Sequence, residues 1–442
     1  MSTLFSLRRA DTLLPLVFLC ALACNSDEPT TKTRSPSNDD DGRDDADGDG
    51  ETSQDDVTSD DARASPRRPD AGTPKLDAAV EPVDGGKPLD AGTKPSQVDA
   101  QPPSTTVDSG AGTKGDTDSA VPTTPSSSFA NSTLIPHASW TCGMPEGIPS
   151  PVGAPVVFTA SLDIANIREV GDTRFGKRQL IEVNTGTFKG PKLDATVMAG
   201  GLDQPLLLSN GAVELEQILT LKTKDGKYIY LRVCGTAPHA DEPMRVVMDF
   251  EAPNGSSVAF LNTTKLVGTR ELDAAGKKLT LTVSDVSQVA PSASSVKVDN
   301  PAGVVDQTWD CKVDKGTAGT QIYKEVVNIG GSLSVGASKR GNRNIIPITG
   351  GTTTGRIKGS VLPGGGDFQI LDGGFLLDAR YTVKSDEGEL ILVRNCGPAA
   401  ALVPVFEARA AGCYAFLNAN DWLSSSPSVG LGTVTLTTTE KR

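Results

Sequence analysis

The sequence predicts an all-β protein, with two tandem antiparallel β-barrels behind a long N-terminal tether. Short runs rich in Val, Ile, Leu and Thr alternate with turns that contain Gly, Asp and Asn, and helical periodicity is nearly absent. Several motifs occur twice, about 160 residues apart, a period too long for a solenoid repeat, so each copy should bury its own core. The residues before the two copies are acidic and low in complexity. A pair of β-sandwiches is the alternative architecture.

Residues 1–23 have the features of an export signal. Arg8 and Arg9 precede an apolar run at 13–22 that is too short for a membrane-spanning helix, which needs about 20 residues. The following Ala21-Leu22-Ala23-Cys24 resembles the lipobox of bacterial lipoproteins, whose cysteine is acylated and becomes the new N-terminus. An ordinary secretory signal with a chance cysteine is the alternative. We expect a lipoprotein signal peptide that leaves Cys24 as the lipid anchor.

Residues 24–130 are expected to form a disordered acidic tether. Asp, Pro, Gly, Ser and Thr dominate this segment, which carries the acidic excess behind the formal net charge of −13. Such a composition cannot bury enough apolar area to offset the entropy of ordering. Its typical reach is on the order of 55–60 Å. With Asn25 after the cysteine, we expect the protein in the bacterial cell envelope, on the outer membrane, facing the periplasm or the cell surface.

The two barrels are expected at residues 131–288 (copy one) and 306–442 (copy two), joined by a linker at 289–305. Their shared motifs include an Arg-x-Cys-Gly sequence, interpreted as a turn, and an Ala-Phe-Leu-Asn sequence, interpreted as a strand. Glycines, an arginine and a glutamate recur in step with them. In copy one these residues are Gly171, Gly176, Arg178, 232–235, Glu251 and 259–262, and in copy two Gly336, Gly341, Arg343, 394–397, Glu407 and 415–418.

One strand in each copy shows which face is buried. In copy two, apolar residues from Phe375 to Val383 occupy every second position, and Asp378 and Arg380 occupy the opposite face. This alternation of apolar and charged residues predicts an antiparallel sheet whose charged face is exposed to water. Hairpin turns are expected directly after this strand and its equivalent, at 386–388 and 224–226.

The cysteines predict one disulfide in each barrel. Cys142 matches Cys311 and Cys234 matches Cys396, so the expected pairs in an exported protein are Cys142–Cys234 and Cys311–Cys396. Cys413 remains, as a buried thiol or as a site of intermolecular pairing. Since no second His/Cys set exists for tetrahedral zinc, we expect no metal and no cofactor.

Six motifs spread over copy two stand in a shared register. They run from the glycine-rich 355–367 through 377–382, 386–388, 394–395 and 405–407 to 414–418. In that order they resemble the bacterial and fungal family catalogued as domain of unknown function 3237. The resemblance implies single β-barrel domains of this size and carries no activity with it. Copy one matches the same pattern in degraded form.

Catalytic constellations are sparse, because only two histidines exist and both lie outside the shared motifs. The barrels show no basic stripe, so nucleic acid is not an expected partner. We expect a binding or interaction module for a small molecule or an envelope partner. The alternative is a barrel-lumen enzyme, isomerase-like or cyclase-like, although no catalytic residue is assigned.

A ligand site, if present, is expected in copy two, because copy one has lost part of the motif set. In copy one, Leu219 and Val233 replace Tyr381 and Asn395. The repeated carboxylates and asparagines have a structural alternative, in which they hold turns or pair with the recurring arginine. Tyr381 could instead bond a neighbour inside a filled core. The candidate residues are Asp367, Tyr381, Asn395, Glu407 and Asn418.

Overall fold

The computed structural model describes residues 129–138, 140, 142–299, 311 and 316–442, all within one compact unit. The signal peptide, Cys24 and nearly all of the expected tether lie outside these residues, as does part of the expected linker.

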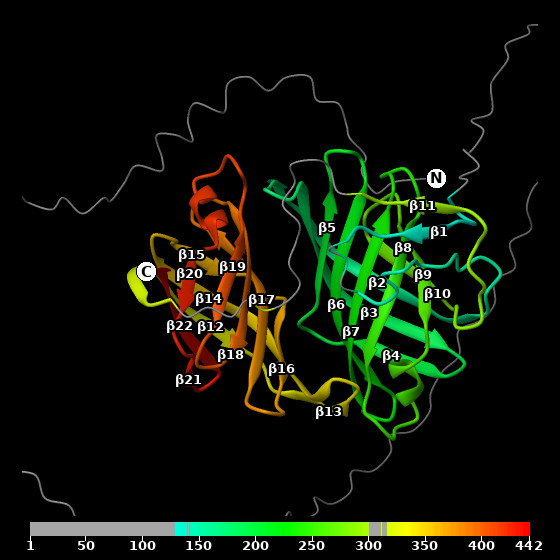
Figure 1. The fold of residues 1–442 in the computed structure, drawn as a ribbon. Coiled ribbons are helices and arrows are strands. Elements are labelled where there is room, and N and C mark those ends of the chain that lie inside the picture. The colour runs from blue at the N-terminus through cyan, green and yellow to red at the C-terminus, as the bar shows by residue number, and fades with distance from the viewer. Residues whose placement is uncertain (1–128, 139, 141, 300–310, 312–315) are drawn as a thin grey trace, which may run out of the picture. The chain divides into compact units, whose positions relative to one another are not determined.

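Barrel one is a closed antiparallel barrel, drawn mainly in green in Figure 1. Its strands follow the order β2-β10-β9-β8-β7-β6-β4-β3-β5, and pairing of β2 with β3 closes the ring. The bounds are β2 (Val156–Asp172), β3 (Lys177–Gly190), β4 (Leu193–Val197), β5 (Leu202–Leu207), β6 (Val213–Thr223), β7 (Tyr228–Ala237), β8 (Met244–Glu251), β9 (Leu266–Leu272) and β10 (Lys278–Asp285), with the 3-10 helix η1 (Ala259–Asn262) before β9.

Barrel two is a barrel-like ring, drawn in yellow to red in Figure 1, whose sheet follows the order β19-β18-β17-β15-β14-β12-β22-β20. β19 and β20 are therefore the two ends of the sheet, and Ser424 N donates to Leu402 O across this seam at 3.2 Å. The bounds are β12 (Ala318–Ile329), β13 (Leu333–Ser338), β14 (Gly341–Gly355), β15 (Gly359–Val361), β16 (Gly366–Ile370), β17 (Leu376–Ser385), β18 (Leu390–Pro398), β19 (Val403–Glu407), η2 (Ala415–Ala419), β20 (Trp422–Ser424), β21 (Ser428–Gly430) and β22 (Thr433–Lys441).

A short parallel pair covers part of the outer face of barrel one. β1 (Thr133–Ile135) pairs with β11 (Ser295–Lys297), which lies within the segment expected to be a linker. Arg245 on β8 fixes this cover, because its guanidinium donates to the backbone oxygens of Ser132 and Ile148 at 2.6 and 2.9 Å. Burial lowers the pKa of Arg245 to about 10.

Both expected disulfides are present. Cys142 joins Cys234 with a Cα–Cα distance of 6.1 Å, and Cys311 joins Cys396 with 5.3 Å. The first ties the segment before barrel one to β7, and the second ties the segment before barrel two to β18. The two hairpin turns are also confirmed, because β6 pairs with β7 and β17 pairs with β18 across them.

Two of the repeated motifs were wrongly assigned from sequence. The Arg-x-Cys-Gly sequences lie inside strands β7 and β18, not in turns. Gly235 is needed there for close packing, since a Cβ would lie 3.1 Å from that of Leu215. The Ala-Phe-Leu-Asn sequences form η1 and η2, not strands, and the asparagine of each folds back to hold the end of the preceding strand. Asn262 accepts from Ala252 N at 2.8 Å and donates to Ala252 O at 2.9 Å.

The face of β6 and β17 expected to meet water is buried instead. Arg380 on β17 pairs with Glu216 on β6 at 2.6 Å, and both side chains are less than a tenth exposed. Arg380 also pairs with Asp378 at 2.9 Å. The charged faces of the two copies therefore cover each other, and paired charges replace the expected contact with solvent.

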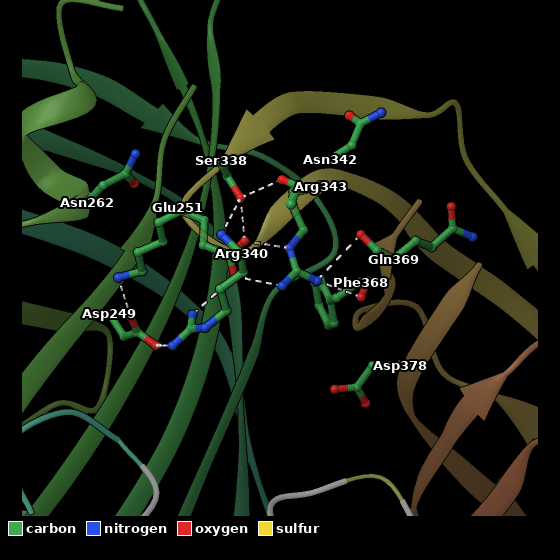
Figure 2. A network of polar contacts seen from close by, with 12 residues as sticks. Asp249, Glu251, Asn262, Ser338, Arg340, Asn342, Arg343, Phe368, Gln369 and Asp378 are labelled. Atoms are coloured by element: carbon green, nitrogen blue, oxygen red, sulfur yellow. Dashed lines mark hydrogen bonds and ion pairs between the residues drawn. The ribbon is translucent and has the colours of Figure 1, made fainter. Parts of the chain in front are cut away.

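A pair of reciprocal contacts, called here the Arg–Glu clasp, joins the two barrels. Arg343 of barrel two donates to both carboxylate oxygens of Glu251 in barrel one, at 3.0 and 2.6 Å, and Ser338 Oγ donates to the same carboxylate at 2.8 Å (Figure 2). In the mirror contact, Arg178 of barrel one donates to both oxygens of Glu407 at 3.0 Å. The repeated arginine and glutamate thus bond each other across the copies.

Candidate functional site

A cavity of about 300 Å³ opens inside barrel two. Most of its wall is apolar, and the polar side chains in it come from the neighbouring strands β16, β17 and β18. Three of the five expected ligand-binding residues, Asp367, Tyr381 and Asn395, line it together. The strand alternation predicted for 375–383 is confirmed, because Phe375, Leu377, Ala379 and Tyr381 all face this cavity.

The polar residues are arranged as a row across three strands. Asp367 on β16 lies opposite Ala379 on β17, and Ala379 lies opposite Asn395 on β18. Directly opposite residues share one face of a sheet, so Asp367 and Asn395 flank the small Ala379 about 10 Å apart, two strand spacings. Because alanine leaves the middle of the row open, a molecule in the cavity can reach both polar neighbours.

Asp367 is held by neutral donors. Gln369 Nε2 donates to its Oδ2 at 2.6 Å, and the backbone N–H of Asp378 donates to Oδ1 at 3.1 Å. Burial raises the pKa of Asp367 to about 6, although the hydrogen bond from Gln369 opposes the shift. At neutral pH the cavity therefore contains a carboxylate that is largely ionised and poorly solvated.

Tyr381 connects the cavity to a second buried carboxyl group. Its hydroxyl donates to Glu325 Oε1 on β12 at 2.6 Å. Both residues are 1% exposed, and burial raises the pKa of Glu325 to about 7 against the opposing effect of the hydrogen bond from Tyr381. The expected alternative for Tyr381, a bond to a neighbouring carboxylate, is therefore present, and the same side chain also faces the cavity.

Asn395 presents an acceptor. Its Nδ2 donates to Ser424 Oγ at 3.0 Å, across the seam between β19 and β20. Within the part of the chain that the structure describes, Asn395 Oδ1 has no hydrogen-bond partner. A buried amide oxygen without a partner is costly, so this atom can accept from a bound molecule.

The same row in barrel one is filled. Asp203, Gln217 and Val233 occupy it, and Gln217 Nε2 donates to Asp203 at 2.6 Å. Arg270 on β9 bonds both oxygens of Asp203, at 3.0 and 2.9 Å, and both side chains are fully buried. Since β9 and β5 are not adjacent strands, this bond crosses the barrel interior.

The other two expected residues lie elsewhere. Glu407 belongs to the Arg–Glu clasp, with a further hydrogen bond from Thr173 at 2.6 Å. Asn418 bonds the backbone of Ala408 at 2.9 and 3.0 Å, as Asn262 does in barrel one. Both have the structural role that their repetition left open. The two histidines do not line the cavity. His137 contacts Glu214, and His239 contacts Asp241.

Sequence reasoning missed Glu325. Counting back from the matched Gly171 and Gly336, its position falls on Ala160 in barrel one, and the register agrees, because Ala160 pairs with Phe188 and Glu325 with Thr353. A position-by-position comparison of the copies would have found it. That comparison shows polar residues in barrel two at positions where barrel one buries apolar ones. In the same order, Tyr323, Glu325, Thr353, Tyr381, Asn395 and Thr438 correspond to Phe158, Ala160, Phe188, Leu219, Val233 and Val283.

The clasp reaches the wall of the site. Arg343 donates through its third nitrogen to Phe368 O at 2.8 Å, on the strand that carries Asp367 and Gln369 (Figure 2). Glu251 of barrel one therefore holds, through Arg343, the strand that forms one side of the cavity.

The fold and cavity define a class of small β-barrel domains, present here in tandem. The family model described as "Protein of unknown function (DUF3237)" matches residues 154–289 and 320–425, more than half of the chain. The chain belongs to this family and contains two copies of its domain, as the sequence motifs predicted.

Curated relatives match shorter stretches. A UPF0311 protein of Bradyrhizobium diazoefficiens is 37% identical over 78 residues, which is 17% of this chain and 51% of the relative. One from Rhodopseudomonas palustris is 40% identical over 79 residues, or 17% and 52%. The chain thus spans about half the length of these relatives. A solved structure, described as a beta-barrel like protein from Acinetobacter baumannii, aligns at 24% identity and a TM-score of 0.27, covering 31% of this chain and 98% of its own.

Among the residues that the structure describes, no helix has the length and apolar character needed to cross a bilayer.

Proposed function

We propose that this chain is a lipid-anchored protein of the bacterial cell envelope, on the outer membrane, whose second barrel binds a small molecule in its lumen while the first serves as its structural partner. The observation that carries the binding role is the cavity of about 300 Å³ in barrel two, where Asp367, Tyr381 and Asn395 converge. An apolar pocket with a few convergent polar groups is the usual form of a small-molecule site. The filled row of barrel one supports its assignment as the structural partner and that of barrel two as the binding domain.

The anchor rests on Ala21-Leu22-Ala23-Cys24 and on the tether that follows it. Changing Cys24→Ser should move the protein from the membrane fraction to the soluble fraction of the producing bacterium, because the acyl chains supply the attachment. Intact-protein mass spectrometry of the parent should show the added lipid mass. A correctly processed Cys24→Ser protein that stays in the membrane fraction would disprove the anchor.

The lumen site is tested by what the native protein retains. Membrane-extracted protein, analysed by native mass spectrometry, should carry a small molecule that Ala379→Leu loses, because leucine fills the open middle of the row. The matched control is Lys384→Leu, an exposed position on the same strand, which should retain the molecule. Equal retention by both variants would show that the molecule lies elsewhere.

A second candidate function is catalysis in the same lumen, of an isomerase-like or cyclase-like kind. The hydrogen bond from Tyr381 to Glu325 favours it, because Tyr381 faces the cavity and can take a proton from a bound molecule at its oxygen while its own proton passes to the Glu325 carboxylate. An isomerase or cyclase gives a product with the same mass as its substrate. If the barrel is such an enzyme, the parent should retain product and Tyr381→Phe should retain substrate, which chromatography separates although their masses are equal. Identical retained molecules would favour binding alone.

A further inference from the structure

A cationic side chain, that of Arg270, lies in the lumen of barrel one. The guanidinium of Arg270 bonds both oxygens of Asp203, and the exposed fraction of both side chains is zero. Arg270 lies opposite Leu281 on β10 and Met244 on β8, and both of these residues belong to the apolar core of barrel one. Barrel one therefore shows what the aspartate shared by the two copies can hold, which is a cationic head with an apolar body behind it.

Barrel two keeps the aspartate and lacks the arginine. Counting from the shared Phe-Glu-Ala and Ala-Phe-Leu-Asn motifs, the position of Arg270 falls on Ser426, an exposed residue beyond the end of β20. Ala379 replaces Gln217, the other partner of Asp203. Both changes remove groups that fill the lumen, and in barrel two the cavity lies in front of the carboxylate.

The polar atoms available in this cavity are hydrogen-bond acceptors. Asp367 is a carboxylate whose bonded donors are neutral, and Asn395 Oδ1 accepts from no partner among the described residues. The Tyr381 hydroxyl already gives its proton to Glu325, so it has no proton left to donate to a ligand. A ligand that satisfies acceptors on both sides of Ala379 must bring hydrogen-bond donors, and a carboxylate in an apolar wall favours a positive charge among them.

We infer that the lumen of barrel two binds a small organic cation, an amine or guanidine with an apolar body, whose head lies against Asp367 as the guanidinium of Arg270 lies against Asp203. This inference rests on the proposed lumen binding and names the chemical class of its ligand. The head donates to Asp367, and the body packs on the apolar wall around Leu377, Ile348 and Leu436.

The test uses four probes with the same hexyl body and different heads: hexylamine, hexylguanidine, hexanol and hexanoate. Isothermal titration calorimetry with the full chain at pH 8, where Asp367 is ionised, should show that the two cations bind at least tenfold more tightly than hexanol, with hexanoate weakest. Asp367→Asn should weaken the binding of the cations at least tenfold and leave hexanol unchanged. Asp386→Asn, an exposed carboxylate in the β17–β18 hairpin, is the matched control and should bind all four like the parent.

The outcomes separate the two proposals, and the probe series on the unaltered protein decides even if Asp367→Asn fails to fold. If hexanol or hexanoate binds as tightly as hexylamine, the lumen takes apolar molecules without regard to charge, and the cation inference is overturned while lumen binding stands. Cation binding that survives in folded Asp367→Asn also overturns it. If none of the four probes binds, both proposals fail for molecules of this size.

Discussion

Glu325 places a buried carboxyl group at a position where barrel one has the apolar Ala160. Burial raises its pKa from 4.5 to about 7, so the folded barrel favours the protonated form. A group whose pKa is higher in the folded protein contributes stability that is fully present below its unfolded pKa and is lost as the pH rises through the folded pKa.

This predicts a pH-dependent effect of Glu325→Gln. Glutamine keeps an acceptor for Tyr381 and cannot ionise, so its stability relative to the parent should increase between pH 4.5 and 7 and stay constant above that range. The relative gain should be up to about 3 kcal/mol, from about 1.4 kcal/mol per unit of pKa. Thermal melts of both proteins at pH 4.5 and 8 measure it. A difference in midpoint that does not change with pH would show that Glu325 ionises normally.

At this scale the sequence identified part of the site. Tyr381 and Asn395 were found because they stand in matched motifs where copy one has Leu219 and Val233. Glu325 was missed because it lies outside those motifs, in a strand whose other residues alternate like any barrel strand. Glu407 and Asn418 were grouped with the site because repetition marks a residue as important without showing which copy its side chain contacts.

At the scale of elements, the filled lumen of barrel one depends on one bond from β9 to β5. Arg270→Leu should destabilise the full chain by about 3–5 kcal/mol, because Asp203 would remain buried without its partner. The double variant Arg270→Leu/Asp203→Leu should recover much of that loss, since no charge is then left unpaired. Urea denaturation of the parent, both single variants and the double variant measures the coupling. Additive losses would mean that the two residues do not depend on each other.

The two hairpins and the alternation of 375–383 followed from the sequence because period-two alternation and turn residues are local properties. The Ala-Phe-Leu-Asn helices did not, because their conformation depends on side-chain bonds to a preceding strand, as Asn262 makes to Ala252. No feature of the sequence predicted the seam between β19 and β20 either. It lies where β20 is three residues long and its counterpart β9 is seven.

At the scale of the whole molecule, the Arg–Glu clasp makes each barrel depend on the other. Although burial disfavours the charged form, hydrogen bonds and the charge of Arg343 hold the pKa of Glu251 below its ordinary value. The alternation of residue types indicated that the outer faces of β6 and β17 are polar. It could not show that the charged residues of each barrel bury those of the other by pairing with them.

The clasp predicts that damage in barrel one reaches the site in barrel two. Glu251→Gln should lower the thermal midpoint of the full chain and weaken ligand retention in barrel two, because Arg343 loses its charged partner and β16 loses an anchor. Glu407→Gln breaks the mirror contact and is the matched control. It should lower the midpoint by a similar amount with a smaller effect on retention, since Arg178 holds Gln204 of barrel one, not the cavity wall. Equal loss of retention in both would contradict a specific role for Glu251.

The reciprocal clasp has the form of a two-fold interface in which both surfaces belong to one polypeptide. In a symmetric dimer every substitution appears twice, so a residue that fills one lumen fills both. Fusion removes this constraint. It also makes association independent of dilution, because the covalent link sets the effective concentration of each half for the other. A chain of this kind can carry one filled barrel and one open barrel in a fixed one-to-one ratio, because a substitution in one lumen is not repeated in the other.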